Sequence, residues 1–101
     1  MTLGLSSKEL SEINLIFKKF PGIQEAILFG SRAMGTFKPG SDVDIALKGQ
    51  TTLQVVARVK ALLEEESSMP YTFDVVDYHT IETTAFKDHI DKYGKSIYYE
   101  S

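Results

Sequence analysis

The sequence predicts a small α/β (α+β) domain in which helices pack on a short mixed β-sheet. Short apolar runs of strand length alternate with longer segments whose apolar residues recur at helical spacing. The chain has 101 residues, 43% of them hydrophobic and 25% charged, which is typical of one globular domain over residues 1–101. The link between the first two strand candidates is short for a full crossover, so a mixed sheet is favoured. The pattern leaves open whether the domain has two layers or three.

The N-terminal part predicts a helix followed by a buried strand. Ser6 and Glu9 have the spacing of a capping box, and Pro21-Gly22 ends the helix. The apolar residues between them follow helical spacing: Leu10, Ile13, Ile16, Phe17 and Phe20. The short apolar run Glu25–Phe29 predicts a strand. Residues 30–40 are rich in turn formers, with one helical turn expected near their start.

The middle of the chain predicts a second strand and a second helix. Val43–Leu47 is the strand candidate, and Thr51 and Gln54 repeat the capping-box spacing at the start of the helix. One face of this helix is expected to comprise Leu53, Val56, Val59, Lys60 and Leu63. Residues 64–66 are three glutamates, which the helix dipole disfavours at a C-terminus, so this end is expected to fray.

The C-terminal part predicts a third strand, a last helix and an apolar tail. Phe73–Asp77 is the strand candidate. Apolar residues at helical spacing predict a helix over residues 80–93, closed by Gly94. The tail, Ile97–Tyr99, is expected either to add to a sheet edge or to contact a partner.

Composition excludes several classes of function. Eleven basic and fourteen acidic side chains give a net charge of −3, a poor match to a nucleic-acid binder, so no direct nucleic-acid binding is expected. No apolar run approaches the roughly 20 residues that a membrane-spanning helix needs. The chain has no cysteine, which excludes disulfides and thiolate metal sites, and its start lacks the pattern of a secretory signal. A cytoplasmic location is therefore expected.

One run, from Gly30 to Asp44, joins two features of phosphate chemistry. It opens with a Gly-Ser turn, and backbone N–H groups of such a turn can hold phosphate oxygens. It closes with Asp42 and Asp44, which are two residues apart and would point to the same face of a strand, where they can share a magnesium site. Together these features predict phosphoryl-transfer chemistry on a nucleotide.

Three familiar motifs do not explain this run. Gly30 to Gly35 has P-loop spacing, but Thr36-Phe37 stands where Lys followed by Ser or Thr is required. Arg32 replaces the second glycine of a dinucleotide-binding G-x-G-x-x-G motif. An EF-hand opening at Asp42 fails because Ala46-Leu47 occupies a ligand position and the obligatory glycine.

The run resembles the minimal nucleotidyltransferases, a branch of the DNA polymerase β-like superfamily. The matching residues are Gly30, Ser31, Arg32, Ala33, Gly35, Ser41, Asp42, Asp44 and Ile45. The resemblance covers nearly the whole chain and implies the nucleotidyltransferase fold, with a third carboxylate from a later strand. Asp74 occupies that place, and Asp77 is the alternative if the strand is irregular. Met34 departs from the pattern, since many members carry a second arginine there.

The resemblance implies Mg²⁺-dependent transfer of AMP from ATP to a hydroxyl acceptor, with two metal ions. Asp42 and Asp44 would bridge the ions, and Asp74 would complete the site nearest the acceptor and take its proton. The nucleotide-binding set would be Gly30, Ser31, Arg32 and Ser41, with Lys38 as a further source of positive charge. His79 and His89 have no partner pattern and are expected at the surface.

The resemblance also implies a partner. Many family members pair with a HEPN-domain toxin, act as its antitoxin and transfer AMP to one of its tyrosines. A chain of this size leaves little room for a walled acceptor pocket, so the acceptor is expected on that partner. The alternative is a non-catalytic nucleotide-binding subunit that neutralises or scaffolds the HEPN-type partner by contact. The complete set of Asp42, Asp44 and Asp74 favours the enzyme.

Overall fold

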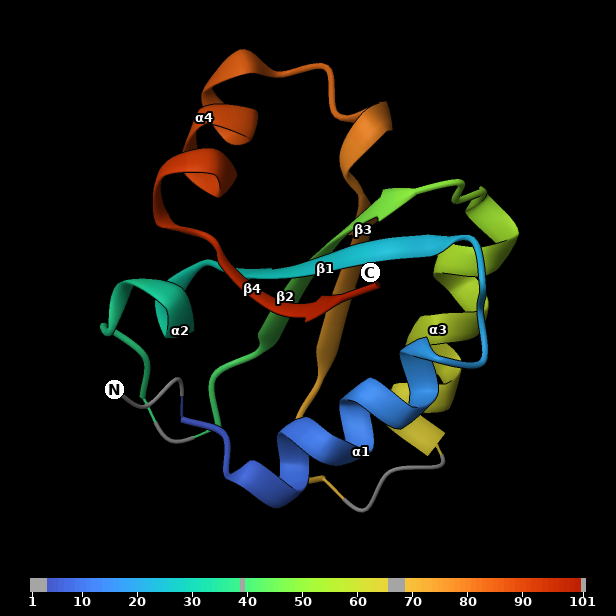
Figure 1. Ribbon diagram of the computed structural model, residues 1–101. Helices are drawn as coiled ribbons and strands as arrows, with labels where there is room; N and C mark the ends of the chain where they lie inside the picture. The colour runs from blue at the N-terminus through green and yellow to red at the C-terminus, as the bar shows by residue number, and fades with distance from the viewer. Residues whose placement is uncertain (1–3, 39, 66–68, 101) are drawn as a thin grey trace.

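A computed structural model describes residues 4–38, 40–65 and 69–100 (Figure 1). Helices and strands alternate along the chain in the order that the sequence predicts. The elements are α1 (Ser7–Phe17), β1 (Ile23–Phe29), α2 (Ser31–Met34), β2 (Val43–Gly49), α3 (Leu53–Glu65), β3 (Phe73–Asp77), the 3₁₀ helix η1 (Tyr78–Thr80), α4 (Thr84–Tyr93) and β4 (Lys95–Tyr99).

The four strands form one mixed sheet in the order β3-β2-β1-β4. Strand β1 runs antiparallel to both β2 and β4, whereas β2 and β3 are parallel and are joined through α3. The mixed sheet that the sequence predicts is therefore confirmed. The tail adds to a sheet edge as β4, which was one of the two expectations for it.

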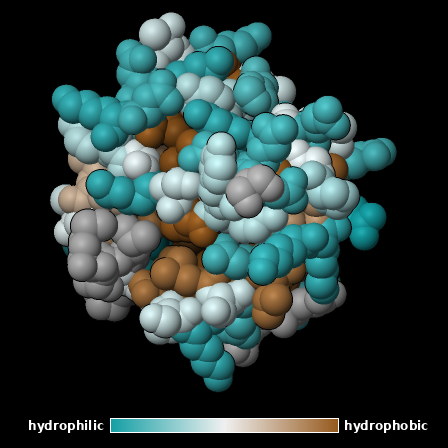
Figure 2. All heavy atoms as spheres, viewed as in Figure 1, coloured by the Kyte–Doolittle hydropathy of each residue, from teal (hydrophilic) through white to brown (hydrophobic). Residues whose placement is uncertain are grey.

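Helices cover both faces of the sheet, which gives three layers. Helices α1 and α3 lie on one face and α4 lies on the other (Figure 1). The larger core fills the α1/α3 side, where Phe17, Leu28, Ile45 and Val59 are buried. A smaller core on the α4 side contains Ile27, Phe29, Ala46 and Ile90. In Figure 2 the outer surface is mostly hydrophilic, and apolar atoms show through near its middle, between the α4 and α1 regions.

Helix α1 begins as its capping box predicts. The Ser6 N–H donates to Glu9 Oε1 at 2.9 Å, and the Glu9 N–H donates to Ser6 Oγ at 3.1 Å. The start of α3 differs from the prediction, because Thr52 rather than Thr51 is the capping residue. The Val55 N–H donates to Thr52 Oγ1 at 3.2 Å, and helix bonding begins from the Thr52 carbonyl.

The apolar face of α3 is narrower than the sequence predicts. Val59 and Leu63 are fully buried, but Leu53 is 84% exposed. The C-terminal end was expected to fray over residues 64–66, but Glu64 and Glu65 are helical, and residue 66 lies outside the described residues. Glu64 has a structural role there, since its Oε2 accepts the Phe73 N–H at 3.0 Å. No helix in the described ranges is long and apolar enough to cross a membrane.

The last helix is shorter than predicted. Residues 78–80 form the separate 3₁₀ helix η1, in which the Asp77 carboxylate accepts the His79 N–H at 3.0 Å, and α4 starts only at Thr84. Gly94 ends α4 as predicted, but its φ of −64° is not left-handed. A side chain at this position would overlap Ile27, so close approach of α4 to β1 explains the glycine.

Candidate functional site

The sheet topology brings the predicted carboxylates to one end of the sheet. Because β1 is antiparallel to β2 and β3 is parallel to it, the end of β1 lies beside the starts of β2 and β3. Asp44 pairs with Phe29 on one side and with Asp74 on the other. Val43 and Ile45 belong to the core on the α1/α3 side, so the alternation of a strand directs Asp44 to the α4 side.

The negative charges of Asp74 and Asp42 act on the carboxyl group of Asp44. The pKa of the half-buried Asp44 carboxyl is raised, first by burial and then by the negative charges of Asp74 and Asp42. The positive charge of Arg32, and that of His89 when protonated, act in the opposite direction. Mutual repulsion among carboxylates is the condition that a bound divalent cation relieves.

The carboxylates of Asp42, Asp44 and Asp74 have the right chemistry for Mg²⁺, but they are not arranged as a formed metal site. Carboxylate oxygens are the hard ligands that Mg²⁺ takes, together with substrate phosphates and water. The side chains of Asp42 and Asp74 are exposed, whereas that of Asp44 is half-buried. Within the described ranges, however, no three Asp, Glu or His side chains converge as a ready-made metal site. The carboxylates would therefore have to close around an ion as it binds.

The Gly-Ser turn lies directly against Asp44. Gly30 has φ +77° and ψ −153°, a conformation that is essentially restricted to glycine. A β-carbon at Gly30 would overlap Asp44 Oδ2, so only glycine allows the turn to approach the carboxylate this closely. Ser31 then begins the single helical turn α2, as predicted, and Gly35 ends it in the left-handed conformation.

The Arg32 side chain is engaged within the protein, and its contact with the nucleotide stays a prediction. The side chain is only 2% exposed. The guanidinium donates from Nη1 to the Gly4 carbonyl at 3.1 Å and from Nη2 to the Ser41 carbonyl at 2.8 Å. It also stacks on the rings of Phe37 and Tyr71, with its central carbon 5.2 Å and 4.6 Å from their centroids. This geometry fits a residue that ties the loop to the N-terminal segment better than one that contacts phosphate.

Ser41 is also engaged within the loop. Its hydroxyl accepts the Lys38 N–H at 2.8 Å, and its own N–H donates to the Lys38 carbonyl at 2.9 Å. These two bonds close a turn immediately before Asp42. Ser41 therefore sets the direction in which the chain enters β2, and a contact between Ser41 and the nucleotide stays a prediction.

His89 is the residue that sequence reasoning missed. It was expected at the surface, but it is half-buried on α4, and its Nε2 accepts the Gly30 N–H at 3.3 Å. Its ring packs against Phe29 and Tyr93, at centroid distances of 6.2 and 5.4 Å. A signal was available, because Phe86, His89, Ile90 and Tyr93 follow the i, i+3, i+4, i+7 spacing of one helix face.

The structure separates the two candidates for the third carboxylate. Asp74 is the register partner of Asp44, whereas Asp77 pairs with Leu47 three residues further along β3. The odd spacing between them places Asp77 on the opposite face of the strand, and its carboxylate caps η1. The arrangement therefore favours Asp74 over Asp77.

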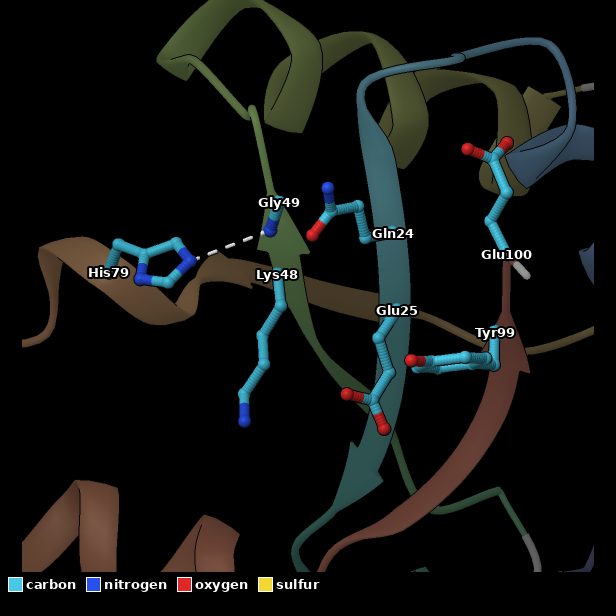
Figure 3. Close-up of a pocket in the computed structure, with 7 residues that line it drawn as sticks. All are labelled: Gln24, Glu25, Lys48, Gly49, His79, Tyr99 and Glu100. Atoms are coloured by element: carbon cyan, nitrogen blue, oxygen red, sulfur yellow. Dashed lines mark hydrogen bonds between the residues drawn. The ribbon is translucent and has the colours of Figure 1, made fainter.

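A well-formed hollow lies elsewhere on the protein. It has a volume of about 530 Å³ and is lined by Glu25, Lys48, Gly49, His79 and Tyr99, among others. Figure 3 shows these side chains around the end of β2 and the start of β1, with the Gly49 N–H directed to His79. Asp44 is five residues from Gly49, roughly 16 Å along the strand. The hollow is thus at the opposite end of the sheet from the aspartates.

Comparison with known families agrees with this geometry. The family model described as "Polymerase beta, Nucleotidyltransferase" matches residues 11–101. The chain belongs to this nucleotidyltransferase family. The resemblance drawn from the Gly-Ser and Asp-x-Asp residues is therefore confirmed, and so is the fold class.

Two curated relatives of this chain bear adenylyltransferase names. The protein adenylyltransferase MntA of Shewanella oneidensis is 30% identical over 86 residues, which cover 85% of this chain and 61% of MntA. The probable protein adenylyltransferase MntA of Haemophilus influenzae is 32% identical over 81 residues, covering 77% of this chain and 69% of that protein. The chain thus spans about three fifths of the length of the Shewanella relative.

Solved structures of toxin–antitoxin complexes share the nucleotidyltransferase fold. One, a toxin–antitoxin with AMP-PNP, gives a TM-score of 0.73 at 23% identity and covers 96% of this chain and 76% of its own. Another is a tri-AMPylated Shewanella oneidensis HEPN toxin in complex with its MNT antitoxin. It gives a TM-score of 0.68 at 21% identity and covers 92% of this chain and 71% of its own.

Proposed function

We propose that this protein is a Mg²⁺-dependent nucleotidyltransferase that transfers AMP from ATP to a tyrosine hydroxyl of a partner HEPN toxin, and so acts as its antitoxin. Family membership and the adenylyltransferase names of its relatives support the reaction class. The AMPylated HEPN toxin in a structural neighbour supports a HEPN toxin as the partner that receives AMP, and the tyrosine follows from the family resemblance.

One observation carries the proposal. Asp44 lies between the Gly30 turn and Asp74, with Asp42 two residues before it. A phosphate-binding turn and a cluster of hard oxygen ligands thus meet at one end of the sheet. Nucleotidyl transfer requires both, because the triphosphate must be held while charge develops on its oxygens.

The Gly-Ser turn and the three aspartates would have different roles in the reaction. Ser31 and the backbone of the Gly30 turn would hold the β- or γ-phosphate. The β- and γ-phosphates leave together as pyrophosphate when the bond between the α-phosphorus and the oxygen that bridges it to the β-phosphate breaks. The acceptor oxygen forms the new bond to the α-phosphorus, and Asp74 is placed to take the acceptor's proton. Asp42, Asp44 and Asp74 would hold two Mg²⁺ ions, which when bound neutralise phosphate charge and align the attacking and leaving oxygens.

The acceptor would come from the partner chain. The aspartates lie at an open end of the sheet, and neither of the two best-defined hollows contains Asp42, Asp44 or Asp74. A protein side chain that approaches this end needs no walled pocket. This fits a tyrosine presented by another folded protein better than a small-molecule acceptor.

The combined variant Asp42→Asn and Asp44→Asn tests the proposal. We expect it to fold and to lose all Mg²⁺-dependent transfer of radiolabelled AMP from ATP to the HEPN partner encoded beside it. The single variant Asp77→Asn, on the opposite face of β3, serves as the matched control and should retain transfer. Undiminished labelling of the partner by the double variant would contradict the catalytic assignment.

A non-catalytic role is the second candidate function. The observation that favours it is the lack of three converging metal ligands among the described residues. In this case the chain would neutralise its partner by contact alone. The same double variant decides the point, because a binding module would still suppress the partner's toxicity in cells, whereas an enzyme would not.

A further inference from the structure

Gly30 is fixed by side chains from two different elements. On β2, Asp44 fills the space beside its α-carbon. On α4, His89 Nε2 accepts its N–H at 3.3 Å. Because Nε2 is the acceptor, the proton of the neutral ring resides on Nδ1. The start of the Gly-Ser turn is therefore tied to α4 as well as to the sheet.

The His89 ring is itself held in place. Phe29 meets it edge to face, with an angle of 84° between the rings, and Tyr93 packs against it one helical turn further along α4. The helix cannot move away easily, since Ile90 is buried and Gly94 lies against Ile27. The position of the imidazole is thus set by packed elements rather than by solvent.

We propose that His89 is a positioning residue, which acts through the Gly30 N–H to hold the Gly-Ser turn against Asp44. The inference rests on the proposed function and names the residue that keeps Ser31 directed at the phosphates. The Gly30 N–H donates its hydrogen bond to His89 on α4. The contacts with phosphate would therefore be made by the groups that follow Gly30 in the chain. In this role His89 would act without touching the phosphates or the acceptor.

The expected effect is on nucleotide affinity. The turn would contact the same phosphates in the ground state and in the transition state, so loosening it should raise KM for ATP and leave kcat little changed. A single hydrogen bond of this kind corresponds to a change of about 3- to 10-fold.

Two variants of similar size distinguish the hydrogen bond of His89 to Gly30 from the packing of its ring. In His89→Gln the amide oxygen can reach the place of Nε2, whereas in His89→Asn it reaches only the place of Nδ1. We expect KM for ATP to rise about 3- to 10-fold in the Asn variant and to stay within about twofold in the Gln variant. His79→Asn is the matched control, because His79 Nε2 accepts a glycine N–H in the same way, from Gly49 at 3.5 Å. It should leave KM unchanged.

A measurement without catalysis tests the bond itself. In ¹⁵N-labelled protein without nucleotide, we expect a scalar coupling across the N–H···N bond between the Gly30 amide and His89 Nε2, lost in His89→Ala. Absence of the coupling overturns the proposal. Equal KM values for ATP in the Gln and Asn variants overturn it as well. So does a loss of ATP affinity in the His89 variants that merely parallels a fall in their Tm. If no acceptor is labelled, the proposed function fails, while the coupling and the dissociation constant of ATP still decide the role of His89.

Discussion

The carboxylate of Asp44 fills the space that a β-carbon on Gly30 would need. We therefore expect Gly30→Ala to destabilise the protein more than the same replacement at Gly35, which has open space at its β-carbon position. The φ and ψ of Gly30 are accessible almost only to glycine, and the new methyl group would also displace Asp44. Urea unfolding should show a loss above the roughly 1–2 kcal/mol expected for a left-handed residue alone.

Gly35→Ala is the matched control for this prediction. Gly35 has a similar φ of +79°, but nothing lies within 4 Å of its β-carbon position. The free energy of unfolding of this variant should fall only by the cost of placing alanine in the left-handed conformation, about 1–2 kcal/mol. Adding Asp44→Ala to Gly30→Ala should restore part of the stability, whereas additive losses in this double-mutant cycle would contradict the contact.

The raised pKa of Asp44 predicts how stability depends on pH. The pKa of Asp44 in the folded state lies above the ordinary value of 3.8. Between pH 3.8 and the folded pKa, the folded state therefore binds more protons than the unfolded state. Stability therefore falls as pH rises through that window, and the loss persists at neutral pH. Asp44→Asn removes the charge, so its Tm at pH 7 should exceed that of the wild type, and the gain should vanish below pH 3.8.

The control for this pH profile is Glu82→Gln, an exposed carboxylate in the link before α4. Its Tm difference from the wild type should be small across the whole range. An Asp44→Asn variant that is less stable than the wild type at pH 7, or whose difference does not change with pH, would contradict the raised pKa.

The buried guanidinium of Arg32 predicts a loss of stability on replacement. Arg32→Met removes the donors to the Gly4 and Ser41 carbonyls and the stacking on two rings. We expect a loss of about 2–4 kcal/mol in urea unfolding. Lys38→Met, at an exposed position in the same loop, should change stability by no more than about 0.5 kcal/mol. Unchanged stability of Arg32→Met together with weaker ATP binding would restore the phosphate role.

Local signals in the sequence predict much of the fold and part of the site. The capping box at Ser6, the strand Phe73–Asp77 and the helical turn after Gly30 depend on neighbouring residues, and the structure confirms each. The contacts of Arg32 and His89 span 28 and 59 residues of chain, so local spacing can indicate the inward face of His89 on α4 but cannot identify the bond partner of either side chain. The sequence therefore predicts that Asp44 and Asp74 lie on neighbouring strands, which the strand register bears out, but not the contacts that Arg32 and His89 make.

Magnesium should stabilise the folded protein through the aspartates. An ion that binds only the folded state raises Tm with its concentration, and it also relieves the repulsion among Asp42, Asp44 and Asp74. We expect Mg²⁺ to raise the Tm of the wild type and of Asp77→Asn, since Asp77 faces away and asparagine can still cap η1. In Asp74→Asn the shift should shrink or disappear. If the Mg²⁺-dependent rise in Tm is lost in Asp77→Asn but kept in Asp74→Asn, then Asp77 rather than Asp74 is the third metal ligand.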